Sequence, residues 1–196
     1  MVARPEPPRW SVEAYLEMER GSAVRHDYLD GHVYAMAGGS RRHSRIGVNV
    51  TTALNILLRG GPCQVFNSDM MVRIDAKNYV YPDASVSCDP SDTADDEAAS
   101  ISRPSLIVEI LSDDSTAGYD RGDTFNLLYK RIETLREYVL VDTQRIAVDV
   151  HRRGTDEDWN VRSYVAGDEV SLESLDATIP IVAFYEPATP SNVAPS

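Results

Sequence analysis

The stretch from Ser105 to Leu111 reads SLIVEIL and is the most continuously hydrophobic segment of the chain. A short apolar run of this kind predicts a central strand that is buried on both faces. One carboxylate, Glu109, interrupts the run. A buried carboxylate needs an opposite charge, a metal ion or a raised pKa, because burial penalises its charged form. Glu109 is therefore either paired with a buried arginine or part of a functional site.

A second carboxylate, Asp83, follows Pro82 at the start of another apolar strand, from Ala84 to Val86. By itself, a Pro-Asp pair is more typical of a turn. If the two strands are adjacent, however, Asp83 and Glu109 come close enough to share a divalent cation. Carboxylate oxygens, a backbone carbonyl and waters suit Mg²⁺ or Mn²⁺, and such an ion activates water toward a phosphodiester.

The remaining pattern alternates between helical and extended periods. Apolar residues at helical spacing predict helices over 12–20, 41–58 and 117–132. Alternating residues predict hairpins over 25–36, with Asp30-Gly31 at the turn, and over 137–150. Further strands are predicted over 64–67, 70–74, 79–87, 159–165 and 169–172, and an exposed acidic loop over 89–102. The mixture predicts an α+β fold with one central sheet.

Length and charge limit the number of domains and the classes of partner that the chain can have. The 196 residues suffice for one domain, which we expect over 10–185 with flexible tails at 1–9 and 186–196. No apolar run approaches the roughly 18 residues that span a bilayer, and the N-terminus lacks an apolar signal core. We therefore expect a cytoplasmic protein with no membrane partner. The formal charge of −12 repels nucleic acid at long range.

Two cysteines, Cys63 and Cys88, lie 25 residues apart without a C-x-x-C partner. A metal pair, a disulfide and two core thiols all remain open. We favour core thiols, because free cysteine is often a buried residue.

Basic side chains open the helix predicted over 41–58: Arg41, Arg42, His43 and Arg45. The N-terminus of a helix attracts phosphate, and arginines strengthen that attraction. We expect these side chains to contact phosphate or DNA. The alternative is a solvated helix start, and a single histidine is more often structural than catalytic.

Several short motifs occur in a fixed order: Asp30-Gly31; Gly38-Gly39-Ser40 before His43; Tyr81-Pro82-Asp83; Pro104 and then Val108-Glu109-Ile110-Leu111-Ser112; Asp120-Arg121 ahead of Tyr129; and Glu137-Tyr138-Val139-Leu140-Val141-Asp142. This ordered set resembles the Uma-type family of restriction endonucleases, within the PD-(D/E)XK nuclease superfamily. The resemblance covers roughly residues 10–185. It implies a restriction-endonuclease-like fold, in which helices flank a mixed central β-sheet with extra β-hairpins.

The resemblance also implies a catalytic site. Asp83 and Glu109 match the family's acidic residues and would bind Mg²⁺ or Mn²⁺, with the carbonyl of Ile110 as a third protein ligand. DNA is the implied substrate, and a homodimer is the implied assembly because two subunits cut two strands.

One position departs from the family. The superfamily lysine, two residues after the acid, is Leu111 here, and the shifted lysine of the Uma-type family matches Thr124. Threonine donates a hydrogen bond but carries no charge. Arg121, one turn earlier on the predicted helix, would stabilise phosphate charge but is a poor proton shuttle. Thr124 and Arg121 complete the predicted catalytic set.

Three functions follow from these observations. The first is a metal-dependent endonuclease that hydrolyses DNA phosphodiesters. The second is a family member that binds metal or a partner without cleaving, which Thr124 and the charge of −12 favour. The third is a phosphodiesterase acting on a small substrate. Asp27, before the Asp30-Gly31 turn, is either an outer neighbour of the metal or a surface charge on an edge strand.

Overall fold

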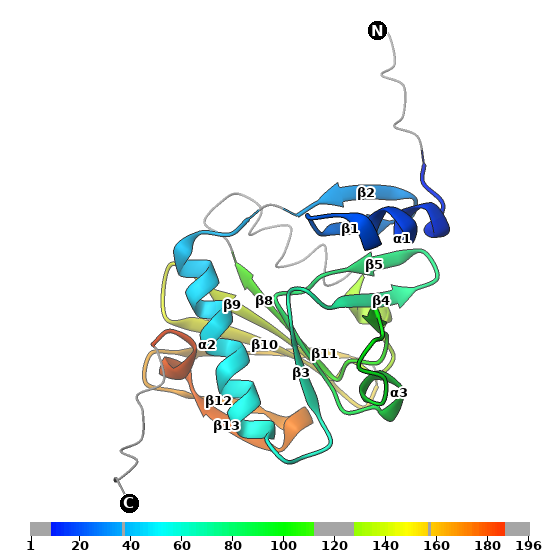
Figure 1. Ribbon diagram of the computed structural model, residues 1–196. Coiled ribbons are helices and arrows are strands. Elements are labelled where there is room, and N and C mark those ends of the chain that lie inside the picture. Colours follow the sequence, from blue (N-terminus) through cyan, green and yellow to red (C-terminus); the bar gives the residue numbers. More distant parts are fainter. Residues whose placement is uncertain (1–8, 37, 112–127, 157, 187–196) are drawn as a thin grey trace, which may run out of the picture.

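The computed structural model describes residues 9–36, 38–111, 128–156 and 158–186 (Figure 1). Its centre is a six-stranded sheet in the order β11-β10-β9-β8-β6-β3. Strand β8 (Leu106–Leu111) lies between β9 (Glu137–Asp142), which runs parallel to it, and β6 (Ala84–Ser87), which is antiparallel. Every residue of β8 is buried except Glu109, which is partly buried. The predicted central strand is confirmed.

The outer strands of this sheet are β10 (Ala147–Arg153), β11 (Trp159–Val165) and β3 (Gln64–Asn67). A second sheet has five strands in the order β2-β1-β5-β4-β7. It comprises β1 (His26–Leu29), β2 (His32–Ala35), β5 (Asn78–Val80), β4 (Met71–Asp75) and β7 (Ser100–Ile101). The predicted α+β class is confirmed, with the six-stranded sheet as its mixed central sheet. The predicted first hairpin, β1–β2, belongs to the additional five-stranded sheet.

Pro82 explains why the chain passes from the five-stranded sheet to the six-stranded sheet at this point. The segment 79–87, predicted as one strand, is divided into β5 in one sheet and β6 in the other. Proline has no N–H to donate to a strand ladder and restricts the residue before it, so β5 ends at Val80 and the next strand begins at Ala84. The break leaves Asp83 just ahead of β6.

Two helices are capped as their sequences predict. The side-chain hydroxyl of Ser11 accepts the N–H of Ala14 at the start of α1 (Val12–Gly21), and Ser40 accepts the N–H of His43 at the start of α2 (Arg41–Leu58). Helix α2 buries Ile46, Val50 and Leu54 against the six-stranded sheet, while α1 lies with the five-stranded sheet (Figure 1). Among the described residues, no helix is long and apolar enough to cross a membrane.

The C-terminal part adds β12 (Glu169–Leu172), the 3₁₀ turns η3 (Glu173–Leu175) and η4 (Ile181–Phe184), and β13 (Ala177–Pro180), which pairs with β12. Glu137 of β9, fully buried, ties this part to the central sheet. It accepts hydrogen bonds from Arg152 Nε at 2.9 Å and from the backbone N–H of Glu173 and Ser174 at 3.0 and 2.9 Å. A buried carboxylate is thus satisfied by one guanidinium and two amides.

Two predicted segments differ from the structure. The acidic stretch 89–102 is not an open loop, because it contains the short helix α3 (Pro90–Thr93) and β7. Buried Asp92 closes it by accepting the N–H groups of Ser102 and Arg103, each at 2.9 Å. Most of the helix predicted over 117–132 lies outside the described residues. Its described end is a 3₁₀ turn, η2 (Tyr129–Arg131), rather than an α-helix.

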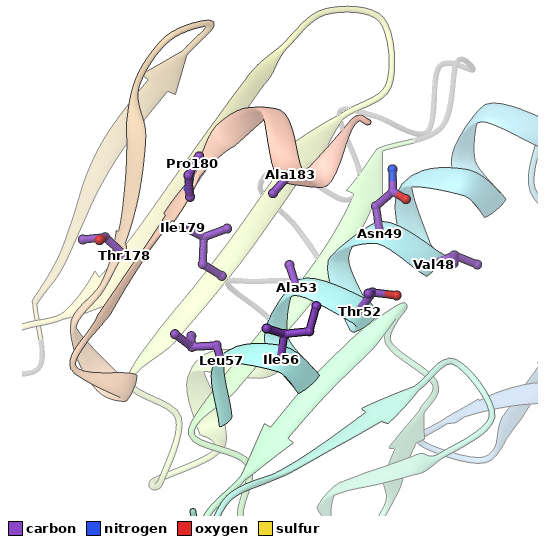
Figure 2. Close-up of a pocket in the computed structure, with 10 residues that line it drawn as sticks. All are labelled: Val48, Asn49, Thr52, Ala53, Ile56, Leu57, Thr178, Ile179, Pro180 and Ala183. Atoms are coloured by element: carbon purple, nitrogen blue, oxygen red, sulfur yellow. The ribbon is translucent and has the colours of Figure 1, made fainter. Parts of the chain in front are cut away.

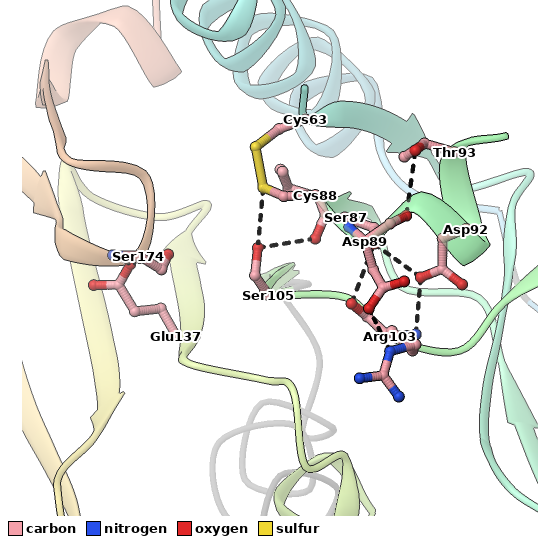
Figure 3. The surroundings of a disulfide bond; sticks show 11 residues. Cys63, Ser87, Cys88, Asp89, Asp92, Thr93, Arg103, Ser105, Glu137 and Ser174 are labelled. Atoms are coloured by element: carbon pink, nitrogen blue, oxygen red, sulfur yellow. Dashed lines mark hydrogen bonds and ion pairs between the residues drawn. A yellow bond between two sulfur atoms is a disulfide. The ribbon is translucent and has the colours of Figure 1, made fainter. Parts of the chain in front are cut away.

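Cys63 and Cys88 form a disulfide, so the prediction of two core thiols is wrong (Figure 3). The pairing of β3 with β6 explains it: Gln64 lies opposite Ser87, and one step beyond this register Cys63 lies opposite Cys88. The bond fastens the edge strand β3 to the sheet. Disulfides are uncommon in a reducing cytoplasm. The cytoplasmic location stays a prediction, which the redox state of this pair in cells would test.

Replacing both cysteines by alanine should lower the free energy of unfolding by about 3 kcal/mol, because the cross-link constrains roughly 25 residues of unfolded chain. Urea denaturation followed by circular dichroism measures the change. Wild-type protein treated with dithiothreitol should lose a similar amount. If reduction leaves the urea midpoint unchanged, the disulfide does not stabilise the fold.

Candidate functional site

The strand register brings the two predicted carboxylates together. Ala84 of β6 lies opposite Val108 of β8, and one step beyond this register Asp83 lies opposite Glu109. The Asp83 side chain also reaches the backbone of β8, because its Oδ2 accepts the N–H of Ile110 at 2.7 Å. Asp83 therefore continues the edge of β8 where β6 has ended, and this bond ties its carboxylate to the backbone of Ile110, the residue after Glu109.

His43, in the first turn of α2, faces the same carboxylate. Its Nε2 lies 3.3 Å from Asp83 Oδ2, and both side chains are mostly buried, with exposed fractions of 20% and 16%. Gly39 makes room for the ring, since a Cβ built at Gly39 would lie 2.7 Å from His43 Nδ1. The glycine before the helix thus permits the histidine to lie against Asp83.

The arginines of the predicted phosphate-binding cluster differ from His43 in solvent exposure. Arg41, Arg42 and Arg45 are exposed at the start of α2, whereas His43 is turned inward. The helix start therefore presents two faces: an inner imidazole on the carboxylate site and outer guanidinium groups toward solvent. This arrangement suits the approach of a polyanion to the carboxylates.

Tyr129 holds the second carboxylate. Its hydroxyl donates a hydrogen bond to Glu109 Oε1 at 2.5 Å, and the ring is almost fully buried. Burial, and then the charge of Glu109, raise the pKa of Tyr129 well above its usual value. The phenol therefore stays protonated and remains a donor to Glu109. The sequence analysis assigned Tyr129 no role in the site. The only local indication was its place on the apolar face of the helix predicted over 117–132.

Asp27 also belongs to this neighbourhood. Its strand, β1, lies between β2 and β5, so the alternative of a surface charge on an edge strand is wrong. Asp27 is partly buried, and its Oδ1 accepts the N–H of Tyr81 at 3.1 Å. Its charge contributes to the raised pKa of Tyr129. A third carboxylate therefore acts electrostatically on the side chain that holds Glu109.

The donor set fits a hard divalent cation in part. Asp83 and Glu109 supply carboxylate oxygens, and the carbonyl of Ile110 points to the same strand edge as its N–H, which already contacts Asp83. Within the described residues, no three His, Cys, Asp or Glu side chains form a ready metal-binding group. A cation here would rest on two carboxylates, one carbonyl and water, a set that suits Mg²⁺ because it retains several waters.

Two predicted catalytic residues, Arg121 and Thr124, lie outside the described residues.

An apolar groove of about 420 Å³ lies between α2 and the β13–η4 segment, and neither Asp83 nor Glu109 lines it (Figure 2). Its lining residues include no ionisable side chain. The groove therefore offers no acid–base chemistry of its own.

The chain is similar to known proteins over most of its length. Residues 12–181 match the model of the family Uma2, described as "Putative restriction endonuclease". A protein of Synechocystis sp. (strain ATCC 27184 / PCC 6803 / Kazusa), slr1290, is 38% identical over 91% of this chain and 92% of its own length. A second protein of that organism, sll1609, is 29% identical over 81% and 89% of the two lengths.

A solved structure shares the fold. It is a crystal structure from Anabaena variabilis ATCC 29413, described as "a putative nuclease belonging to DUF820", with a TM-score of 0.68. The match covers 89% of this chain and 97% of that chain at 17% sequence identity. The predicted fold class is confirmed by this likeness, which at such low identity concerns the fold alone.

Replacing Gly39 by alanine should displace the His43 ring from Asp83, because the new Cβ would lie 2.7 Å from Nδ1. Nuclear magnetic resonance of the His43 ring protons measures the shift of the imidazole. Gly38→Ala is the matched control, since nothing lies within 4 Å of a Cβ at Gly38. Equal spectra for Gly39→Ala and wild type would show that the ring is not held by this contact.

Proposed function

We propose, from the premise that this chain belongs to the Uma2 family of restriction endonucleases, that it is a metal-dependent endonuclease acting on DNA phosphodiesters. One observation carries the proposal: Asp83, just ahead of β6, lies opposite Glu109 of β8, and its carboxylate accepts the Ile110 N–H. Two carboxylate residues on neighbouring segments of a buried sheet can hold the divalent cation that activates water for phosphodiester hydrolysis.

The chain's own residues would prepare the site in three ways. The Ile110 N–H and His43 hold the Asp83 carboxylate, and the Tyr129 hydroxyl holds Glu109, so neither has to be ordered when substrate arrives. Both carboxylates and the Ile110 carbonyl would hold Mg²⁺ or Mn²⁺. When bound, that ion would supply an activated water and stabilise charge on the phosphate oxygens.

The exposed arginines Arg41, Arg42 and Arg45 would bind the DNA backbone. They lie on the first turn of α2, where backbone N–H groups and the helix dipole add to their positive charge. The overall charge of −12 opposes non-specific DNA binding but not a local contact of this kind. A homodimer stays a prediction, which sedimentation of the purified protein would test.

The second function, binding without cleavage, is favoured by Thr124, where the family has lysine. Such a lysine would polarise the attacking water and stabilise phosphate charge. Without it, metal binding is better supported than turnover. Two experiments distinguish the alternatives.

Asp83→Ala and Glu109→Ala should each lower plasmid cleavage in Mg²⁺ or Mn²⁺ by about two orders of magnitude or more, because each removes a cation ligand. Asp96→Ala, which removes an exposed carboxylate elsewhere, should cleave as wild type does. Calorimetry should show weaker Mn²⁺ binding to Asp83→Ala. If the wild-type protein cleaves neither single-stranded nor double-stranded DNA, the proposed nuclease activity is refuted. If Asp83→Ala binds Mn²⁺ with unchanged affinity, the proposed metal site is refuted.

Thr124→Lys should raise the cleavage rate, because it restores a cation at the family's lysine position. The rate is compared with wild type at equal Mg²⁺ and protein concentration. Thr124→Gln, which is of similar length without the charge, serves as the control. A rate for Thr124→Lys that is unchanged or lower would show that this position does not serve the reaction.

A further inference from the structure

A polar pocket of about 410 Å³ lies between α1 and the five-stranded sheet, where Arg20, Arg25 and Arg73 line it. It is on the sheet face that packs against α1 through Tyr79 and Met71, whereas the opposite face packs against β8. The pocket therefore lies apart from the Asp83–Glu109 site. Its side chains have no part in the reaction proposed above.

Arg73 turns toward this pocket because of the strand alternation. It lies opposite Tyr79 in the pairing of β4 with β5 and is exposed, in a strand whose neighbouring residues are buried. Among the described residues, no carboxylate lies within ion-pair distance of Arg73. A guanidinium so placed keeps its full capacity to bind an anion that enters the pocket.

Arg25 lies on the pocket's aromatic wall. Its guanidinium carbon is 5.7 Å from the centre of the Tyr81 ring, and its Nε is 3.8 Å from Asp69 Oδ1. That ion pair is long and exposed, so it contributes little stability, and Arg25 can exchange Asp69 for a phosphate at a small cost in free energy. Arg25 is thus oriented by the ring rather than neutralised by its neighbour.

The buried carboxylate in the pocket, Glu19, is already satisfied. It is 3% exposed, and His26 donates its N–H to Oε1 at 3.1 Å while the His26 Nδ1 lies 2.9 Å from Oε2. After burial, a hydrogen bond to Glu19 is the main cause of the raised pKa of Tyr81. The Glu19 carboxylate is therefore already bonded by His26 and Tyr81.

We propose that this pocket binds a terminal phosphomonoester, carried by the 5′ end of a DNA strand or by a free nucleotide. Arg20 is paired with Glu17 on its own helix, so Arg25 and Arg73 are the guanidinium groups that would meet a ligand. Of the two carboxylates in the pocket, Glu19 is already bonded by His26, and Asp69 lies 3.8 Å from Arg25. Two guanidinium groups match a dianionic terminal phosphate better than a singly charged diester. The apolar wall of Met70, Met71 and Tyr81 accommodates the sugar and base, and the volume suits a nucleotide. The DNA end as source rests on the proposed function, whereas the phosphate pocket does not.

The test measures binding of 3′-fluorescein-labelled oligothymidylate by fluorescence anisotropy, with EDTA present so that no strand is cut. The full chain should bind the 5′-phosphorylated oligonucleotide about tenfold more tightly than its 5′-hydroxyl form. Arg73→Gln and Arg25→Gln should abolish that preference. Arg162→Gln, the matched control, removes an equal charge from exposed β11 and should retain it.

Competition identifies the source. Displacement of the labelled strand by thymidine monophosphate but not by thymidine supports a nucleotide site, whereas preference for the phosphorylated oligonucleotide alone supports a DNA-end site. Equal affinity for the two oligonucleotides, or a preference that survives both arginine substitutions, would overturn the proposal. Asp83→Asn, which should abolish cleavage, should keep the phosphate preference, so failure of the nuclease and failure of the pocket give different results.

Discussion

Strand β8 is the constraint on which the rest of the structure depends, because both major hydrophobic clusters meet on it. Leu106, Val108 and Ile110 join the cluster under α2, while Ile107 and Leu111 join the cluster beneath the five-stranded sheet. Burying one aliphatic side chain contributes roughly 1.5–3 kcal/mol. Because both faces of β8 are packed, a charged side chain at any of its positions carries a desolvation cost. Glu109 lies within this strand, and the hydrogen bond that the Tyr129 hydroxyl donates helps to satisfy its carboxylate.

A second layer of polar contacts fixes Tyr129 in place. Arg153 of β10 donates to the carbonyls of Lys130 and Ile132 at 2.9 and 2.8 Å, and to that of Leu135 at 2.9 Å, while its guanidinium stacks on Trp159. One partly buried cation thus satisfies three carbonyls in the segment that carries Tyr129. The position of Glu109 therefore depends on a guanidinium two strands away.

Charge is arranged so that an acidic chain presents positive groups in selected places. Part of the acidic stretch 89–102 is satisfied locally: hydrogen bonds from Ser91 and from the adjacent Arg103 lower the pKa of Asp89 to about 2. Arginines gather instead at the start of α2 and in the pocket beside α1. A phosphate-bearing ligand would meet these local groups at short range, where screening by salt leaves the distant acidic residues little influence.

The sequence by itself determined the elements whose signals are local. Capping serines and helical spacing predicted α1 and α2, the Asp30-Gly31 turn predicted the first hairpin, and the apolar run 105–111 predicted β8. It also named Asp83 and Glu109 together, because a family motif and a costly buried charge pointed to the same residues. Pro82 could have predicted that the segment 79–87 is divided into two strands. The apolar pattern continues across the proline, so periodicity alone predicted a single strand.

Only the tertiary structure decided which residues act together. The pairing of Cys63 with Cys88, the approach of His43 to Asp83 and the bond from Tyr129 to Glu109 join residues 20 to 40 positions apart. Each depends on strand register and helix placement, which are settled by packing of the whole core rather than by neighbouring residues. For the same reason the inner position of Asp27 and the pocket of Arg25 and Arg73 left no local signal: the side chains are ordinary, and their meeting is a property of the fold.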